Sequence, residues 1–389
     1  MKPFTLIAIS VLLAAFIYSC GEKDTSTADI YNINLTEGYT DTTLHLEDFA
    51  EDVRLIRLET NKQCLVNRLR GHIGGKHIVV MGRENMLHFS ADDGSYIGKI
   101  TQKGKGPHEF DYIEAWAVDK NEQSLIYHNR GGSNITRYNM EDHKFEEFVP
   151  LATEKDVTDL GNIVFVNDTL LAVKRGMFSA CQYQYFYQTT TGRFIKGRKK
   201  EPIPHPGGWA GSSPVFKKAT DNSIIFQPFE SDSIFQINGT DIELLAVFQN
   251  KSPGRDGDYT INHHGVFLYG GRNRLFLREN NFKTQITPNS SRFKIMEPGY
   301  FFSNLNDNQL YRIKSLYYDD LGLELKDYNL RFPHKNLFVI HYQAMEFKDM
   351  IREQLKNGDI PVAKRKKLKQ LNGKITENDN PIIITGKCI

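Results

Sequence analysis

The chain has 389 residues, with 49 Lys and Arg against 47 Asp and Glu, which gives a formal net charge of +2. This balance leaves no overall field that would attract nucleic acid, so nucleic-acid binding is set aside as a function. The 12% of aromatic residues and the 30 glycines favour strands and turns over long helices, in one large β domain or two ordinary ones.

The first nineteen residues have the pattern of an export signal. Lys2 supplies a basic start, and the apolar run 4–17 is too short to span a bilayer comfortably. The run ends in Ile-Tyr-Ser-Cys-Gly, which resembles a bacterial lipobox with Cys20 as the processed, diacylated N-terminus. Residues 1–19 are therefore predicted to be a lipoprotein signal peptide, and the acyl chains on Cys20 to be a membrane anchor. An ordinary cleaved secretory peptide with an incidental Cys20 is the alternative.

A polar stretch follows the lipobox, and residues 20–29 are predicted to be a flexible tether. Glu22 and Asp24 close behind Cys20 resemble the surface-export signal of Bacteroidota lipoproteins, although Lys23 interrupts them. We expect an outer-membrane lipoprotein that faces the periplasm or the cell surface, and the sequence leaves the leaflet open.

Three further cysteines are present: Cys64, Cys181 and Cys388. An odd number in an exported chain allows at most one disulfide plus a free thiol. Cys64 follows the first predicted strand and Cys388 lies in the last, so these two could pair; separate small buried residues are the favoured alternative. Since no CxxC or Cys/His spacing indicates a metal, neither a metal site nor a cofactor is predicted.

Turn-rich segments recur along the chain at a regular interval. An apolar or aromatic residue precedes each turn, and successive examples are 49, 49, 48 and 51 residues apart: Phe89, Tyr138, Tyr187, Phe235 and Ile286. Periods of about 40 to 50 residues with hairpins are typical of propeller blades. A four-stranded blade cannot bury both of its faces alone, so blades pack around an axis. With a sixth unit over 299–342, the prediction is an all-β, six-bladed β-propeller over residues 30–389.

The C-terminal segment changes to a helical period and then back to a strand pattern. The apolar residues that mark the first helix are Ala344, Phe347, Met350, Ile351 and Leu355. A second helix is predicted to begin near Pro361 and to end at Asn372-Gly373, so the helical insert covers 344–373. Residues 381–389 are predicted to be a closing strand that pairs into the last blade and completes the ring.

Two motifs carry a resemblance to a known family. The first reads Gly-Gln-Gly-Pro-Gly-Glu-Phe in that family; this chain matches it at Gly104, Gly106, Pro107, Glu109 and Phe110, and departs from it at Lys105 and His108. The second is Asp-Asn-Pro before an apolar strand, here ending in Asn380 and Pro381. The chain thus resembles the six-bladed β-propeller lipoproteins of Bacteroidota, related in fold to NHL and TolB-like propellers. The resemblance implies fold and export, and it brings no catalytic residues.

Candidate ligand contacts lie in loops and strand entries. His205 and Trp209 stand in a proline-rich loop, where an exposed Trp could stack on a sugar ring or could pack into its own loop. Arg255 belongs to the turn 254–259, whose two carboxylates could start a calcium site or could simply be solvated. His263 and His264 are either ligands or bases, or a polar strand entry. The link around Gly104 and Gly106 is either a structural connector between blades or an anion-binding nest.

The expected function is a binding or scaffolding module at the cell envelope, with a glycan, a peptide or a partner protein as its ligand. The alternative is a hydrolase or lyase that acts on glycans or lactones in the axial pocket, with catalytic residues unknown. Acids, His or Arg from at least three blades within hydrogen-bond reach of one point would favour the enzyme. A purely structural envelope protein is a further alternative.

Overall fold

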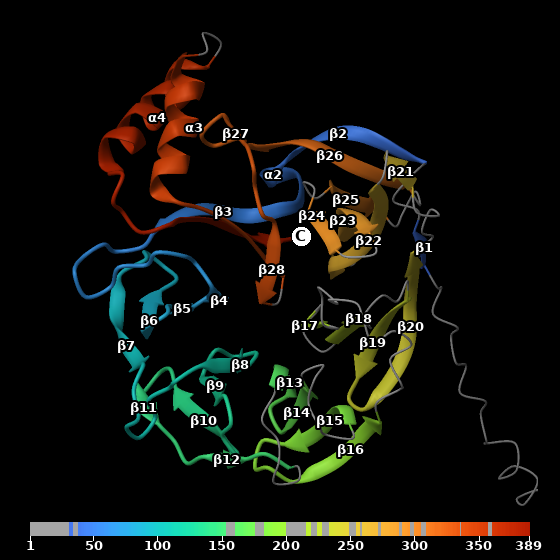
Figure 1. Ribbon diagram of the computed structural model, residues 1–389. Coiled ribbons are helices and arrows are strands. Elements are labelled where there is room, and N and C mark those ends of the chain that lie inside the picture. Colours follow the sequence, from blue (N-terminus) through green and yellow to red (C-terminus); the bar gives the residue numbers. More distant parts are fainter. Residues whose placement is uncertain are drawn as a thin grey trace, which may run out of the picture.

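The computed structural model is a six-bladed β-propeller (Figure 1). It describes residues 31–389, with gaps at 34–37, 153–159, 176–182, 200–214, 219–223, 228–232, 249–253, 257–258, 271–273, 288–289, 296–298, 305–308, 335 and 357–359. The predicted signal peptide and tether, Cys20, Cys181, His205 and Trp209 lie outside the described residues.

Blades 1 to 3 are each built from consecutive antiparallel strands, as a series of hairpins dictates. Blade 1 contains β4 (Gly71–Ile73), β5 (His77–Met81), β6 (Asn85–Ser90) and β7 (Tyr96–Gln102). Blade 2 contains β8 (Ile113–Val118), β9 (Ser124–Asn129), β10 (Asn134–Asn139), β11 (Lys144–Phe145) and β12 (Val149–Pro150). Blade 3 contains β13 (Leu160–Asn167), β14 (Leu170–Arg175), β15 (Tyr183–Thr189) and β16 (Phe194–Lys199).

Blades 4 and 5 each gain an outer strand from the N-terminal segment. Blade 4 contains β17 (Val215–Lys218), β18 (Ile224–Gln227), β19 (Ser233–Asn238) and β20 (Asp241–Phe248), with β1 (Tyr31–Ile33) parallel to β20. Blade 5 contains β21 (Gly254–Asp256), β22 (Tyr259–Gly270), β23 (Arg274–Thr287), β24 (Ser290–Ile295), β25 (Gly299–Asn304), β26 (Gln309–Tyr318) and β27 (Leu323–Leu325), with β2 (Tyr39–His45) parallel to β26. The N-terminal segment therefore runs along the outer edge of both blades.

Blade 6 joins the two ends of the chain. Its strands are, in spatial order, β28 (Arg331–His334), β29 (Leu337–Tyr342), β30 (Ile382–Cys388) and β3 (Ala50–Arg57). The C-terminal β30 is antiparallel to β29 on one side and to the N-terminal β3 on the other, with Ala50 opposite Cys388 and Arg57 opposite Ile382. The predicted closing strand is confirmed, because it locks the last blade to the opening segment.

The apolar core is divided among the six interfaces between neighbouring blades. Alternate residues of one strand face opposite interfaces. In β30, Ile383 packs with Val80 and Leu87 of blade 1, whereas Ile382 and Ile384 pack with residues of blade 5. Each of the other four interfaces has a buried cluster of its own. Since each sheet buries its two faces against its neighbours, the ring as a whole is the folding unit.

Helices α3 (Ala344–Lys356) and α4 (Val362–Lys374) form the predicted insert between β29 and β30. Phe347 and Ile351 of α3 and Leu368 of α4 pack against the core between blades 5 and 6, on the outside of the ring (Figure 1). The short helix α2 (Leu46–Phe49) links β2 to β3. No helix of the described chain is long and apolar enough to cross a membrane.

Two details of the predicted repeat differ from the structure. Ile286 lies opposite Ser291 in the pair β23–β24, which extends beyond the part of β23 that pairs with β25. The segment 310–318 is β26 of blade 5, although it was assigned to the sixth unit, and only the part from β28 onward belongs to blade 6. Cys64 and Cys388 are buried in different interface clusters, so they form no disulfide with each other.

Candidate functional site

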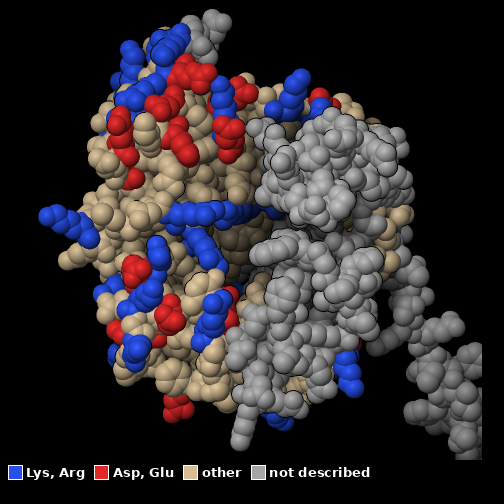
Figure 2. Space-filling view, viewed as in Figure 1, with Lys and Arg blue, Asp and Glu red and all other residues tan. Residues whose placement is uncertain are grey.

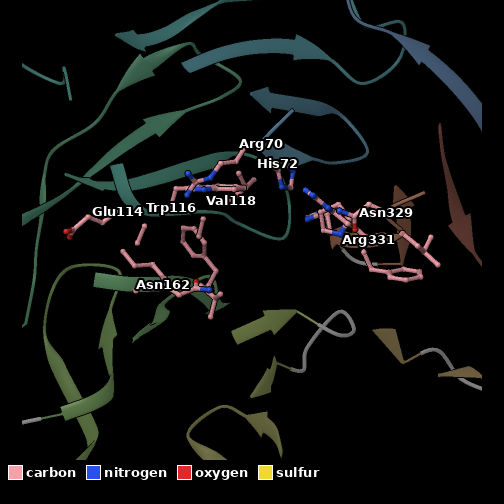
Figure 3. Close-up of a pocket in the computed structure, with 18 of the residues that line it drawn as sticks. Arg70, His72, Glu114, Trp116, Val118, Asn162, Asn329 and Arg331 are labelled. Carbon is pink, nitrogen blue, oxygen red and sulfur yellow. The ribbon is translucent and has the colours of Figure 1, made fainter. Parts of the chain in front are cut away.

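A cavity of about 580 Å³ opens at the propeller axis (Figure 3). Its described wall comes from β4, β8 and β13, from the segment 329–334 that includes β28, and from Arg278 of β23. These elements belong to five segments far apart in sequence, and the radial arrangement of the blades brings them together. Figure 2 shows basic side chains at the edge of the hollow in the middle of this face.

Three arginines line this axial pocket: Arg70, Arg278 and Arg331. The pKa of Arg331 is lowered because protein atoms surround it and because the charges of Arg278 and Arg68 lie nearby. The Nε atom of Arg278 is buried and has no hydrogen-bond partner among the described residues. Burial together with Arg331 and Arg68 lowers the pKa of the neighbouring His341 to about 4. The pocket therefore carries excess positive charge over its described wall.

The carboxylate of Glu114 also lies at this wall, but it is already engaged. It lies 3.2 Å from Nε of Arg130 and 3.3 Å from Nδ1 of His128, and it accepts a 3.1 Å hydrogen bond from the backbone N–H of Leu160. Its side chain is only 3% exposed. Glu114 thus fastens β8 to the start of blade 3, and no other carboxylate of the described wall compensates the charge of the three arginines.

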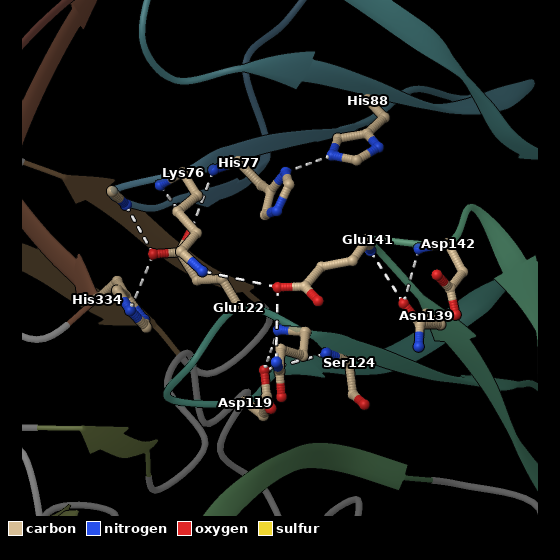
Figure 4. Close-up of polar contacts among 12 residues, drawn as sticks. Lys76, His77, His88, Asp119, Glu122, Ser124, Asn139, Glu141, Asp142 and His334 are labelled. Atoms are coloured by element: carbon tan, nitrogen blue, oxygen red, sulfur yellow. Dashed lines mark hydrogen bonds and ion pairs between the residues drawn. The ribbon is translucent and has the colours of Figure 1, made fainter.

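A buried cluster of two histidines and one glutamate adjoins the pocket. Figure 4 shows Glu122 and His334 of this cluster, and Figure 3 shows His72. His72 of β4 and His334 of β28 line the pocket, and Glu122 reaches them from the turn before β9. Nε2 of His334 lies 3.2 Å and Nε2 of His72 lies 3.7 Å from the carboxylate. Blades 6, 1 and 2 therefore meet at a single carboxyl group.

Backbone N–H groups hold the Glu122 carboxylate in place. Oε1 accepts from Gly75 at 2.8 Å, and Oε2 accepts from Lys76 and His77 at 3.0 Å each. Burial alone would raise the pKa of Glu122, but the contacts with His334 and His72 outweigh it and hold the pKa well below its usual range. Burial lowers the pKa of His72. We therefore assign an ionised carboxylate beside a neutral His72.

Gly74 makes this arrangement possible. A Cβ atom at this position would lie 2.1 Å from Oε2 of Glu122 and 2.5 Å from Nε2 of His72. The turn between β4 and β5 can therefore approach the carboxylate only without a side chain. At the next position, Gly75, a Cβ atom would make an ordinary 3.5 Å contact with the same carboxylate.

A second group of histidines lies behind the cluster. Nε2 of His88 is 2.9 Å from Nδ1 of His77, and the ring of His143 packs edge-on against His88 at 5.5 Å between ring centroids. Burial and these neighbours lower the pKa of His88 to about 3. His88 is neutral at physiological pH, and it supplies a pH-sensitive group inside blade 1.

The glycine-rich link of the family motif connects β7 to β8. Its backbone N–H groups face the chain's own Glu109, whose carboxylate accepts a 2.8 Å hydrogen bond from the N–H of Gly106. Gly104 N–H bonds the carbonyl of Phe110 at 2.9 Å, and a Cβ atom at Gly104 would lie 2.0 Å from the Glu109 carboxylate. An internal anion thus occupies the nest, which favours the structural reading of the link over ligand binding.

His108 stands where the motif that this link resembles has glycine, and its backbone is left-handed, with φ = 61°. Its ring stacks on Phe145, with 4.2 Å between centroids, and on Phe148. His108→Ala should lower the free energy of unfolding by about 1–2 kcal/mol, because the backbone strain stays while the stacking is lost. His108→Gly should be about 1 kcal/mol more stable than the Ala variant because the strain is relieved. Urea unfolding of both variants checks this, and an Ala variant as stable as the Gly variant would contradict it.

The candidate ligand contacts from the sequence stay predictions, because the structure describes no side chain among them. Arg255 lies in β21 opposite Thr260, and His263 and His264 lie in β22 opposite Asn281 and Asn280. Only the backbone of these three residues is described. Sequence reasoning missed Arg70, His72, Glu122, Arg278, Arg331 and His334. No spacing signal connects them, since only ring closure brings blade 6 beside blade 1.

Comparisons with known proteins agree with the fold. One similar structure is a candidate exported protein of Bacteroides fragilis, with a TM-score of 0.64 and 15% identity over 92% of this chain and 99% of that chain. U3-55K (TM-score 0.44, 9% identity, 85% and 98% coverage) and the Myceliophteria thermophila Cps50 (Swd1) β-propeller domain (0.37, 10%, 74% and 96%) are less similar. No curated protein matches the chain significantly. A family model described as a domain of unknown function, DUF4934, matches residues 30–387, so the chain belongs to the DUF4934 family.

Proposed function

We propose that the protein is an exported, lipid-anchored binding module of the cell envelope, and that its axial pocket takes an acidic ligand. The lipobox at Cys20 supports the anchor, and the fold shared with a candidate exported protein of Bacteroides fragilis agrees with export. A mature N-terminus at another residue, found by mass spectrometry, would contradict the anchor. With Cys20 anchored in the membrane, the tether of residues 20–29 would hold the propeller at a distance from it.

The three arginines of the pocket carry the proposal for the ligand. A guanidinium group matches a carboxylate with two parallel hydrogen bonds, and such charge-assisted bonds are about twice as strong as neutral ones. Arg70, Arg278 and Arg331 face one cavity. The only carboxylate in its described wall, that of Glu114, is already paired with Arg130. A ligand that brings its own negative charge compensates this excess.

The rest of the wall favours a sugar acid among acidic ligands. Trp116, Phe165 and Phe332 line the same cavity, and aromatic faces stack on the apolar faces of sugar rings. A cavity of about 580 Å³ is within the usual range for small-molecule sites, so it accommodates the end of a glycan chain. We therefore propose a uronic-acid glycan as the first ligand to test.

Tryptophan fluorescence tests this proposal. The chain has two tryptophans, so a Trp209→Phe background leaves Trp116 as the only reporter. Tetragalacturonate should shift the emission of the full chain in detergent, and added salt should weaken the binding. Arg331→Gln should weaken it about 10-fold, which corresponds to the loss of one charged hydrogen bond.

Two controls make this test decisive. Arg352→Gln on α3 changes the net charge equally but removes an exposed ion pair outside the pocket, so it should leave the affinity unchanged. Neutral maltotetraose should not bind. Equal binding of both sugars, or equal effects of the two arginine variants, would contradict an acidic ligand in the axial pocket.

The alternative function, a hydrolase or lyase, requires acids or bases from several blades at one point. His72, Glu122 and His334 come from three blades, and their ligand atoms lie within 4.8 Å of one another. All three are buried, however, and three backbone N–H groups hold the Glu122 carboxylate. These residues fasten neighbouring blades together, and the described part of the pocket wall offers no free acid or base, so we propose binding and not catalysis.

A further inference from the structure

The meeting point of His72, Glu122 and His334 has the composition of a metal site. Two histidines and one carboxylate are a common ligand set for Zn²⁺ and for non-haem Fe²⁺. The ligands come from β4, from the turn before β9 and from β28, so three blades fix their positions. Rigid elements of this kind hold ligands at a set geometry whether or not an ion is bound.

The distances fit a small ion at the centre of the cluster. Zn²⁺ binds N and O ligands at about 2.0–2.2 Å, so two ligands of a tetrahedral site are about 3.3–3.5 Å apart. Nε2 of His334 lies 3.2 Å from Oε1 of Glu122, and Nε2 of His72 lies 3.7 Å from Oε2. The three ligand atoms all lie within 4.8 Å of one another. The two nitrogen–oxygen distances therefore need to change by only a few tenths of an ångström to match a common ion, and a bound ion would hold the two nitrogens at a similar separation.

The direction of the ring nitrogens gives a second, independent indication. Nε2 of His72 and Nε2 of His334 are both buried, and neither has an aligned hydrogen-bond partner among the described residues. Each lies close to the carboxylate, at 3.7 and 3.2 Å, but neither contact has the geometry of a hydrogen bond. Unpaired buried nitrogens are costly, at about 1–3 kcal/mol each. An ion that both nitrogens face would satisfy them together.

Glu122 retains an acceptor position for such an ion. An ionised carboxylate has about four lone-pair directions. The N–H groups of Gly75, Lys76 and His77 take one direction on Oε1 and two on Oε2. The lone-pair direction that remains is therefore on Oε1, which is the carboxylate oxygen nearest to His334. The same N–H groups orient the carboxylate, as outer-shell hydrogen bonds do in metal sites.

We propose that His72, Glu122 and His334 bind one transition-metal dication, of which Zn²⁺ fits the ligands and distances best. The two histidines line the axial pocket, so the remaining coordination position faces the pocket and takes water or an anionic group of a ligand. Two neutral histidines and one carboxylate leave a charge of +1 on the ion and its ligands. The nearby arginines increase the preference for an anion at that position. The ion itself binds without the acidic ligand, so the two proposals fail separately.

Metal titration of the full chain in detergent tests the site. After treatment with EDTA and dialysis, calorimetry with Zn²⁺ alone should give one site per chain. Co²⁺ in place of Zn²⁺ should give the intense visible bands of a four- or five-coordinate N/O site. Glu122→Gln and His334→Ala should each weaken Zn²⁺ binding about 100-fold or more, since each removes a ligand.

Matched variants separate loss of the site from a folding defect. Gly74→Ala places a Cβ atom against Glu122 and His72 and should weaken Zn²⁺ binding, whereas Gly75→Ala should leave it within about 3-fold of the wild type. His77→Ala keeps the backbone N–H that bonds Glu122 and should also leave it unchanged. A wild-type chain without a stoichiometric Zn²⁺ site, or a site lost in His77→Ala and kept in His334→Ala, would overturn the proposal.

Discussion

Asn380→Ala should lower the free energy of unfolding by about 3–5 kcal/mol, the largest loss expected for a single side chain of the closing segment. Asn380 lies just before β30 and is 2% exposed. Its Nδ2 donates to the carbonyls of Glu59 at 2.5 Å and Cys64 at 2.7 Å, and its Oδ1 accepts from the N–H of Val66 at 2.7 Å. These bonds fasten the C-terminal strand to the loop that leads into blade 1.

The size of this effect follows from what the substitution leaves behind. An alanine leaves one buried N–H and two carbonyls of the loop 59–66 without their partner, and each unpaired group costs about 1–3 kcal/mol. The loop cannot rearrange freely, because Cys64 and Val66 are packed in the core between blades 6 and 1. A ring with a loosened junction loses the support of both neighbouring blades, so the defect should lower the cooperativity of unfolding as well.

Asn380→Asp and Asn378→Ala are the matched comparisons. The aspartate has the same shape but turns an oxygen toward two carbonyl oxygens, so it should be at least as destabilising as alanine. Asn378 lies on the same turn and is exposed, and its replacement should change stability by less than about 0.5 kcal/mol. Urea unfolding followed by circular dichroism measures all three. Similar midpoints for Asn380→Ala and Asn378→Ala would show that Asn380 does not hold the junction.

The sequence predicts the propeller well where a blade is a run of consecutive hairpins. Turns after Phe89, Tyr138, Tyr187 and Phe235 lie between the third and fourth strands of blades 1 to 4. The rule fails at Ile286, because β23 continues beyond the part that pairs with β25 and makes an additional hairpin with β24. A turn at the right interval does not reveal which strand the next segment pairs with.

Sequence patterns alone could not predict the candidate site. Metal-site motifs in sequence depend on ligands from one helix or one loop, whereas positions 72, 122 and 334 come from three blades. Their juxtaposition depends on ring closure, which a sequence pattern predicts only as a topology. Local chemistry was more accessible: the Asp-Asn-Pro tail was recognised as a motif, although its hydrogen bonds to the loop 59–66 required the structure.

Stability should fall steeply with acidification below about pH 6.5, because buried histidines must take up protons when the chain unfolds. Burial and its histidine neighbours lower the pKa of His88 to about 3 in the folded chain, against about 6.5 in an unfolded chain. The unfolded state therefore binds the proton first. The stability is fully present above pH 6.5 and is lost as the pH falls from there toward 3. For His88 alone the loss at pH 5 is about 2 kcal/mol. His341, with a folded pKa of about 4, acts in the same direction.

His88→Gln isolates this contribution, because a glutamine amide can still donate to Nδ1 of His77 but does not titrate. Between pH 6 and pH 4 the wild-type free energy of unfolding should fall more steeply than that of the variant, by about 1.4 kcal/mol per pH unit, which is one proton. Urea unfolding at a series of pH values, with EDTA present so that metal binding does not contribute, measures both slopes. The difference between slopes does not depend on how much the variant loses at pH 7. Equal slopes for the wild type and the variant would mean that His88 takes up its proton in the folded ring as readily as in the unfolded chain. The buried His88 and its neighbours His77 and His143 would then not cause the loss of stability in acid.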